Sequence, residues 1–189
     1  MQTKNLKIGV KLKHARKLSG LRLKELANIV RCTESFLSKV ENDKVRPSLQ
    51  MLHKIVAALN TSIGALFSDT YGRDHVVLRA LERPVLQIGS RRKVGGVTFE
   101  CLIPYQDSKL LYGSIHVIEP GGGSEGDIKH QGEEVGYVLE GEFEITVDKK
   151  TYHLSAGDSF FFDSDLAHGY RNPGKVVTRV IWINTPPTF

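Results

Sequence analysis

The chain has 189 residues, 40% of them hydrophobic and 25% charged, which suits one medium domain or two small ones, each with a real core. No apolar run approaches the ~18 residues of a membrane span, so we expect no membrane partner. The two cysteines, Cys32 and Cys101, lie far apart and form neither a disulfide framework nor a CxxC metal clip. A reducing, cytoplasmic setting is the simplest interpretation.

Charge is distributed unevenly along the chain. Residues 1–70 hold 13 Lys and Arg against 5 Asp and Glu, a net charge of +8, whereas residues 71–189 hold 13 against 16, a net charge of −3. A basic unit joined to a mildly acidic one suggests that the first half meets a polyanion such as nucleic acid. The alternative is a solvated helical surface that is basic by chance.

The first part of the chain shows the apolar spacing of helices. Five segments carry this spacing and are joined by short connections: residues 8–15, 23–30, 37–40, 49–59 and 63–67. Gly20 fits a helix stop, and Thr33 and Ser62 fit N-caps of the third and the last segment. The pattern predicts a compact all-α domain of five short helices.

The second and third predicted helices are joined by only a few residues and form a helix-turn-helix candidate. Near its N-terminus the third helix turns short or polar side chains outward, and such groups can reach base edges in a DNA major groove. These outward side chains are Glu34, Ser35, Ser38 and Lys39. If this helix stood alone, an ordinary solvated helix face would be the better interpretation.

The neighbouring sequence favours the DNA-binding interpretation. Residues 6–68 contain LKELA before the turn, a capping Thr33, Glu41-Asn42 at the end of the third helix and RPS before the fourth. With these features the segment resembles the helix-turn-helix domain of the lambdoid phage repressors and of the xenobiotic-response-element (XRE) family. The resemblance implies a five-helix, lambda-repressor-like domain that binds double-stranded DNA.

The resemblance also implies roles for single residues. The implied DNA contacts are base reading by Glu34, Ser35 and Lys39, a backbone position for Thr33, and phosphate contacts by Arg22 and Asn28. Arg16 and Glu41 fall where the family has a buried ion pair between the first and third helices. Family members commonly bind palindromic operators as homodimers, because two half-sites add their contacts.

Two residues depart from the pattern of that family. Leu23 stands where many members place a glutamine that reaches the DNA backbone, so one expected contact is absent. Arg31 occupies the turn position that usually holds glycine, and it must therefore adopt a left-handed conformation at a cost of about 1 kcal/mol. These departures bear on affinity and docking rather than on the fold.

The helical pattern ends near residue 70. We divide the chain into a DNA-binding domain at 1–69, a linker at 70–83 and a second domain at 84–189, and residues 76–81 fit either a helix or a first strand. Beyond the linker, short runs rich in Val, Ile, Phe and Tyr alternate with turn signals, which is typical of an antiparallel sandwich or barrel. The strand candidates are residues 97–103, 110–118, 135–139, 143–147, 159–162 and 176–183.

Two spaced motifs in this half resemble those of the cupins, which are all-β, double-stranded β-helix barrels. The first motif is matched by Gly122, His130, Glu134 and Gly141, and the second by Gly157, His168 and Asn172. Ile128 stands at the first histidine of the first motif, and Asp163 and Asp165 replace the proline and a glycine of the second. The order of a repressor-like domain and then a cupin resembles a widespread bacterial family of transcriptional regulators.

The cupin resemblance implies a pocket inside the barrel. His130, Glu134 and His168 occupy three of the four cupin metal-ligand positions, and two histidines with one carboxylate suit Fe, Mn, Ni or Zn. In the alternative, the same residues hydrogen-bond an effector without a metal. Because side chains alternate along a strand, Tyr170 points inward if His168 does, and it joins the other three as an effector-binding candidate.

Two functions are compatible with this architecture. In the first, the protein is not an enzyme but a transcriptional regulator, whose cupin barrel binds a small-molecule effector and so changes how a homodimer fits its operator. In the alternative, it is a mononuclear non-haem iron oxygenase that resembles the fosfomycin-forming epoxidases, which also join a repressor-like domain to a cupin. Their H-x3-E spacing is satisfied by His130 and Glu134. The basic first half favours the regulator.

Overall fold

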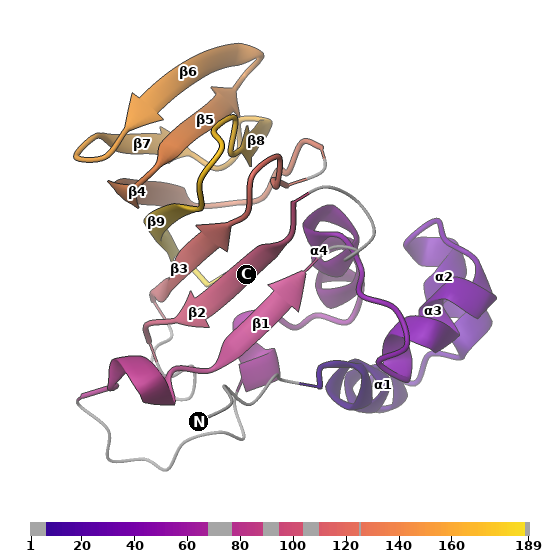
Figure 1. Cartoon of the computed structure of the whole chain (residues 1–189). Coiled ribbons are helices and arrows are strands. Elements are labelled where there is room, and N and C mark those ends of the chain that lie inside the picture. The colour runs from indigo at the N-terminus through magenta and orange to yellow at the C-terminus, as the bar shows by residue number, and fades with distance from the viewer. Residues whose placement is uncertain (1–6, 68–76, 89–94, 104–109, 125, 188–189) are drawn as a thin grey trace.

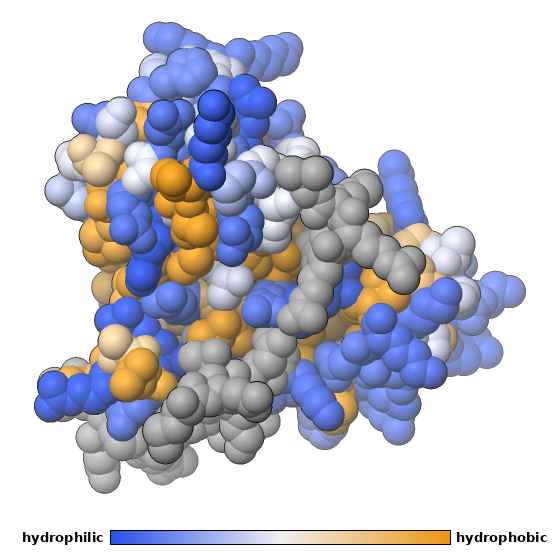
Figure 2. All heavy atoms as spheres, in the orientation of Figure 1, coloured by the Kyte–Doolittle hydropathy of each residue, from blue (hydrophilic) through white to orange (hydrophobic). Residues whose placement is uncertain are grey.

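The computed structural model describes residues 7–67, 77–88, 95–103, 110–124 and 126–187. Helices occupy the N-terminal half of the chain and strands the C-terminal half, and the two halves lie side by side (Figure 1). Hydrophilic side chains cover most of the helical half on the face drawn in Figure 2, whereas apolar patches reach the surface over the β half. No helix among the described residues is long and apolar enough to cross a membrane.

The described residues of the helical half form four α-helices and a short 3₁₀ helix. Their bounds are α1 Gly9–Leu18, α2 Leu23–Ile29, α3 Glu34–Glu41, α4 Leu49–Ala58 and η1 Gly64–Phe67. The caps of α3 and α4 are local: the Thr33 hydroxyl accepts from the Phe36 N–H at 3.1 Å, and Ser48 accepts from Met51 at 3.2 Å. Arg31 has a φ of 57°, which is the left-handed conformation predicted for the turn between α2 and α3.

The prediction of a fifth α-helix is wrong, because the segment forms a 3₁₀ helix instead. The segment forms only the four-residue 3₁₀ helix η1, and the Leu66 N–H bonds to the carbonyl of Ile63, three residues back. Gly64 is a poor helix former, and four residues are too few to accumulate the i→i+4 bonds of an α-helix. The domain therefore has four α-helices rather than five.

The connector between the halves is described from residue 77 onward. Residues 77–79 are neither helix nor strand, and Ala80–Glu82 form a single 3₁₀ turn (η2). Neither alternative for residues 76–81 is therefore right within the described part, and residue 76 itself lies outside it.

The described residues of the β half form nine strands in two antiparallel sheets. One sheet has the order β1-β2-β3-β9-β4-β7 and the other β6-β5-β8. The bounds are β1 Val85–Ile88, β2 Val97–Cys101, β3 Tyr112–Ile118, β4 Glu133–Glu140, β5 Glu142–Val147, β6 Lys150–Ser155, β7 Ser159–Asp163, β8 His168–Arg171 and β9 Thr178–Thr185.

Six of these strands overlap the predicted candidates, and three were missed for identifiable reasons. β1 and β8 have only four residues each, too few for alternation to stand out. β6 reads KTYHLS and is almost entirely exposed, so it has no apolar face to reveal it. The turn before it holds Asp148 and Lys149 with φ of 46° and 68°, as a two-residue hairpin requires.

Alternation along β4 sets the inner face on which the site is built. Glu134, Gly136 and Val138 are buried, while the residues between them are exposed. Gly136 lies against the Phe160 ring so closely that a Cβ there would be 2.1 Å from a ring atom. Only glycine fits at this position, and its absence of a side chain lets Phe160 pack edge-on against Trp182 of β9.

Candidate functional site

The outward face of α3 carries the residues expected to read DNA. Thr33, Glu34, Ser35 and Lys39 are exposed and Ser38 is half-buried, whereas Leu37 and Val40 on the opposite face are fully buried. The hydrophobic face fixes α3 against the domain core, so the polar face is held rigidly toward solvent. This is the geometry that a recognition helix needs.

The two expected phosphate contacts lie on and beside α2. Asn28 is exposed, and the Arg22 side chain is 86% exposed. Arg22 pairs with Glu25 three residues later, with the Nη2 to Oε1 distance at 3.0 Å. An exposed pair of this kind is weak, so the guanidinium can exchange Glu25 for a phosphate at little cost.

Arg16 and Glu41 form a buried ion pair that joins α1 to α3. Arg16 Nε donates to Glu41 Oε1 at 2.6 Å and Nη2 donates to Oε2 at 2.8 Å, while Nη1 donates to the Leu21 carbonyl. The side chains are 11% and 3% exposed. The carboxylate raises the pKa of Arg16, and both charges are compensated within the domain.

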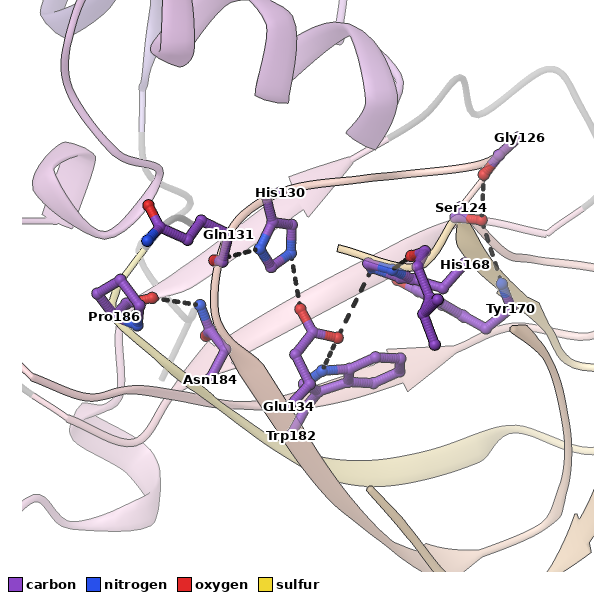
Figure 3. A network of polar contacts seen from close by, with 11 residues as sticks. Ser124, Gly126, His130, Gln131, Glu134, His168, Tyr170, Trp182, Asn184 and Pro186 are labelled. Carbon is purple, nitrogen blue, oxygen red and sulfur yellow. Dashed lines mark hydrogen bonds and ion pairs between the residues drawn. The ribbon is translucent and has the colours of Figure 1, made fainter. Parts of the chain in front are cut away.

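A second polar cluster lies in the β half. His130 precedes β4, Glu134 belongs to β4 and His168 begins β8, and one ligand atom of each lies within 4.8 Å of the others. Figure 3 shows the Glu134 carboxylate between the two imidazole rings, with the Trp182 indole beside it. Glu134 Oε1 is 2.7 Å from His130 Nε2, and Oε2 is 3.7 Å from His168 Nε2 and accepts from Trp182 Nε1 at 2.9 Å.

Backbone carbonyls orient both imidazoles. His130 Nδ1 lies 3.1 Å from the Gln131 carbonyl and His168 Nδ1 lies 2.9 Å from that of Leu166. A carbonyl only accepts, so the Leu166 carbonyl favours a proton on Nδ1 of His168 and leaves its Nε2 facing the carboxylate. His130 lies between two acceptors, the Gln131 carbonyl at Nδ1 and the Glu134 carboxylate at Nε2. Burial lowers the pKa of His168 and outweighs the opposing pull of Glu134, which favours the neutral ring with a lone pair on Nε2.

This donor set fits a divalent cation. Metal-bound histidines commonly donate their second N–H to a carbonyl, and His130 and His168 each have a carbonyl beside Nδ1. The buried Nε2 of His168 has no hydrogen bond within the described residues and points at a carboxylate oxygen. A cation between these atoms would compensate the Glu134 charge and act as a Lewis acid or structural ion, and His130, Glu134 and His168 would hold it.

Two further side chains around the cluster were not predicted from the sequence. Trp182 is buried on β9 and donates to Glu134, and His116 of β3 stacks on Trp182 with ring centroids 4.8 Å apart. Burial lowers the pKa of His116 to about 3. The periodicity of β3 and β9 could have placed both residues on an inner face, but no motif marks them. Tyr170, which was predicted, is buried next to them, and burial raises the pKa of its hydroxyl.

Comparisons with known families agree with the two halves of the fold. The helix-turn-helix family matches residues 12–66, and the cupin domain family matches residues 114–184. The protein also has an exposed recognition-type helix in one half and a buried polar cluster in the other. Together with the two family matches, these features define a class of protein: DNA-binding regulators in which a helix-turn-helix domain is joined to a cupin domain.

Individual relatives narrow this class. The HTH-type transcriptional regulator PuuR of Escherichia coli is 30% identical over 189 residues, covering 100% of both chains. The regulator SutR of the same organism is 22% identical over 166 residues, 87% of this chain and 86% of that protein. A crystal structure of an HTH_3 family transcriptional regulator from Vibrio cholerae has a TM-score of 0.69 and 22% identity over 96% of both chains, which shows a common fold.

The chain therefore belongs to the HTH-type transcriptional regulators that carry a helix-turn-helix domain and a cupin domain. It is a DNA-binding regulator and not an enzyme. The iron-oxygenase alternative is the weaker one, because PuuR, which is 30% identical over the full length of the chain, is named as a regulator.

Proposed function

We propose that the protein is an effector-controlled regulator whose cupin half senses a small molecule through His130, Glu134, His168 and Tyr170. The observation that carries this proposal is the buried carboxylate of Glu134. Its neighbours are the indole N–H of Trp182 and the imidazoles of His130 and His168. Convergent polar groups within an otherwise apolar interior are typical of ligand sites. Occupancy of this site would change the operator affinity of the helical half.

The proposal divides the chain into a DNA-binding domain at 1–69, a linker at 70–83 and a sensor domain at 84–189. It assigns base contacts to Glu34, Ser35, Ser38 and Lys39, a backbone contact to Thr33 and phosphate contacts to Arg22 and Asn28. All of these residues are exposed except Ser38, which is half-buried, and the exposure of the others supports their assignments. A divalent ion such as Fe, Zn, Mn or Ni is the cofactor that best suits two imidazoles and one carboxylate.

The proposal also includes a homodimer on a palindromic operator. Val135 and Tyr137 of β4 are 44% and 46% exposed, and Phe161 of β7, which lies opposite Val135, is 65% exposed. Three adjacent apolar side chains on the outer face of one sheet favour association. Each copy in a dimer would provide one α3 helix, and the two helices would contact the two half-sites of the operator.

The DNA-binding half is tested with the promoter region of the protein's own gene. Lys39→Ala should weaken specific binding about tenfold or more and leave binding to random DNA almost unchanged, because it removes a base contact. Arg22→Ala should weaken binding to both DNAs and lower the salt slope by about one. Gel-shift titrations between 50 and 200 mM salt check both results. Equal losses on both DNAs for Lys39→Ala would contradict a base-reading role.

The sensor half is tested by measuring whether a small molecule changes the affinity for the same promoter DNA. The small-molecule fraction of a cell extract should change the operator affinity of the wild type, and His130→Ala should abolish this response while leaving the affinity without extract unchanged. Anisotropy of labelled DNA measures both affinities. A response that persists in His130→Ala would place the effector chemistry elsewhere.

A further inference from the structure

Helix α4 of the DNA-binding half lies against the candidate sensor site. The His53 ring of α4 stacks on the His130 ring with centroids 5.8 Å apart and an interplanar angle of 5°. One turn earlier on the same helix, Gln50 Nε2 donates to the Asp127 carbonyl at 3.0 Å. In Figure 3 a helix of the N-terminal half passes over the cluster. The helix that follows the recognition helix thus touches a residue of the cupin cluster.

The contact borders a cleft of about 380 Å³ between the two halves of the chain. Its two walls contribute equally. The helical half supplies Gln50, His53, Lys54, Ala57 and Thr61, and the cupin half supplies Asp127, Ile128, Lys129, His130 and Pro187. This volume is in the range of small-molecule sites, roughly 300–1,000 Å³. His130 is common to the cleft and to the cluster, so a molecule in the cleft reaches the cluster directly.

The charged side chains that line the cleft indicate the charge of the ligand that would bind there. Lys54 and Lys129 lie on opposite walls, and Asp127 is the single carboxylate among the described residues that line the cleft. Two ammonium groups and several N–H donors against one carboxylate favour an anion.

We propose that this cleft is the outer half of the effector site, that it is shared by the two domains, and that it takes a small carboxylate. The carboxylate group would lie between Lys54 and Lys129, and the other end of the molecule would reach His130. This inference rests on the proposed sensor function and adds to it that the DNA-binding domain itself supplies part of the site.

A shared site gives a direct route from effector to DNA. A bound anion would attract the ammonium groups on both walls of the cleft. Closing the cleft moves α4 toward the cupin half. Because α4 packs in the same small core as α3, the recognition helix moves with it. The free energy of this shift is bounded by the difference in ligand affinity between the two arrangements.

Trp182 provides the readout, since it is the one tryptophan of the chain and donates to Glu134. Full-length protein is titrated with succinate, 2-oxoglutarate and citrate while Trp182 fluorescence is recorded. We expect at least one of the three to bind the wild type. Lys54→Ala and Lys129→Ala should each weaken that binding about tenfold, the size of one charge-assisted hydrogen bond. The matched controls are Lys13→Ala and Lys175→Ala, two exposed lysines outside the cleft, and they should bind as the wild type does.

Each unfavourable result overturns a defined part of the inference. If none of the carboxylates binds, or if 1,4-diaminobutane binds in their place, the anionic assignment is wrong. If a carboxylate binds equally well to Lys54→Ala, the site is not shared with α4. The proposed sensor function fails separately, when neither the carboxylates nor the extract fraction changes the operator affinity of the wild type.

Hydrogen exchange supplies a second measurement for α4. The bound carboxylate should slow amide exchange in residues 50–58 of the wild type. In His53→Ala the carboxylate should still quench or enhance Trp182 fluorescence, but the slowing in residues 50–58 should be largely lost. Equal slowing in both proteins would show that His53 does not link the site to the helix.

Discussion

Among the described residues, each half of the molecule has one carboxylate that is no more than 3% exposed, and the two have different partners. Glu41 in the helical half is 3% exposed and receives two hydrogen bonds from the Arg16 guanidinium. Glu134 in the β half has a side chain that is 0% exposed, and its partners are the Trp182 indole and two imidazoles. Burying a charge is costly unless it is paired. The first site is complete in itself, whereas the second is completed by protons, a cation or a ligand.

This difference separates a structural ion pair from the proposed sensor site. Arg16 is always charged, so the Glu41 pair is permanent and ties α1 to α3 whatever the conditions. The imidazoles near Glu134 can gain or lose a proton, accept a metal or contact an effector. The same residue type therefore stabilises one domain and gives the other a site that can respond.

The largest expected effect comes from breaking the complete site. Arg16→Ala strands the buried Glu41 charge and should lower the free energy of unfolding of the helical half by roughly 3–5 kcal/mol. Urea denaturation followed by far-ultraviolet circular dichroism measures the loss. Arg22→Ala is the matched control: its pair with Glu25 is exposed, and its removal should change stability little. Similar losses for the two variants would contradict the structural role of the buried pair.

A second, smaller effect is expected from pH. His116 has a pKa of about 3 in the folded protein, well below its ordinary 6.5, because it is buried among aromatic rings. Below pH 6.5 the unfolded chain therefore binds a proton that the folded chain excludes, and stability falls as pH falls, by about 1.4 kcal/mol per pH unit for this residue.

The His116→Phe variant isolates this contribution. It should flatten the dependence of stability on pH between 6 and 4 by about one proton, while the contributions of His53 and His168, whose pKa values are also lowered, remain. Urea unfolding at pH 6, 5 and 4 gives the slopes for the variant and the wild type. An unchanged slope would mean that His116 is already protonated, or is accessible, in the folded state.

The smallest expected change in stability belongs to the incomplete site. Glu134→Gln keeps an oxygen that can accept from Trp182, so the free energy of unfolding should change by less than about 1 kcal/mol. The loss of negative charge should nevertheless abolish binding of Co²⁺, used as a spectroscopic probe of the proposed metal site. Thermal unfolding and visible absorption titration measure the two effects. A loss of stability comparable to that of Arg16→Ala would make Glu134 a structural residue as well.

Local sequence was sufficient for most of the helical half. The Thr33 cap and the left-handed Arg31 depend on bonds and sterics within a few residues, so the pattern around each of them predicts its conformation. The segment at Ile63–Phe67 failed because apolar spacing alone does not reveal whether a run is long enough for α-helical bonds. Where neighbouring residues provide the hydrogen bonds, the sequence determines the structure.

The β half was less predictable because its partners come from distant parts of the chain. The cupin motifs place His130, Glu134 and His168 in one site, and the structure brings their ligand atoms within 4.8 Å of one another. No spacing, however, indicates that Trp182 donates to Glu134 or that His116 stacks on Trp182. Those contacts depend on the register of β3, β4 and β9, which long-range pairing decides.

The sequence by itself determined the two kinds of domain, their order, the polar face of the recognition helix and the three ligand-type residues of the cupin motifs. These features follow from periodicity and spacing within short segments. Only the tertiary structure decided that α4 places His53 against His130 and Gln50 against Asp127, because those pairs are 77 residues apart and meet through domain packing. The physical reason is that such contacts depend on how the two domains pack against each other, which no local pattern in the sequence specifies.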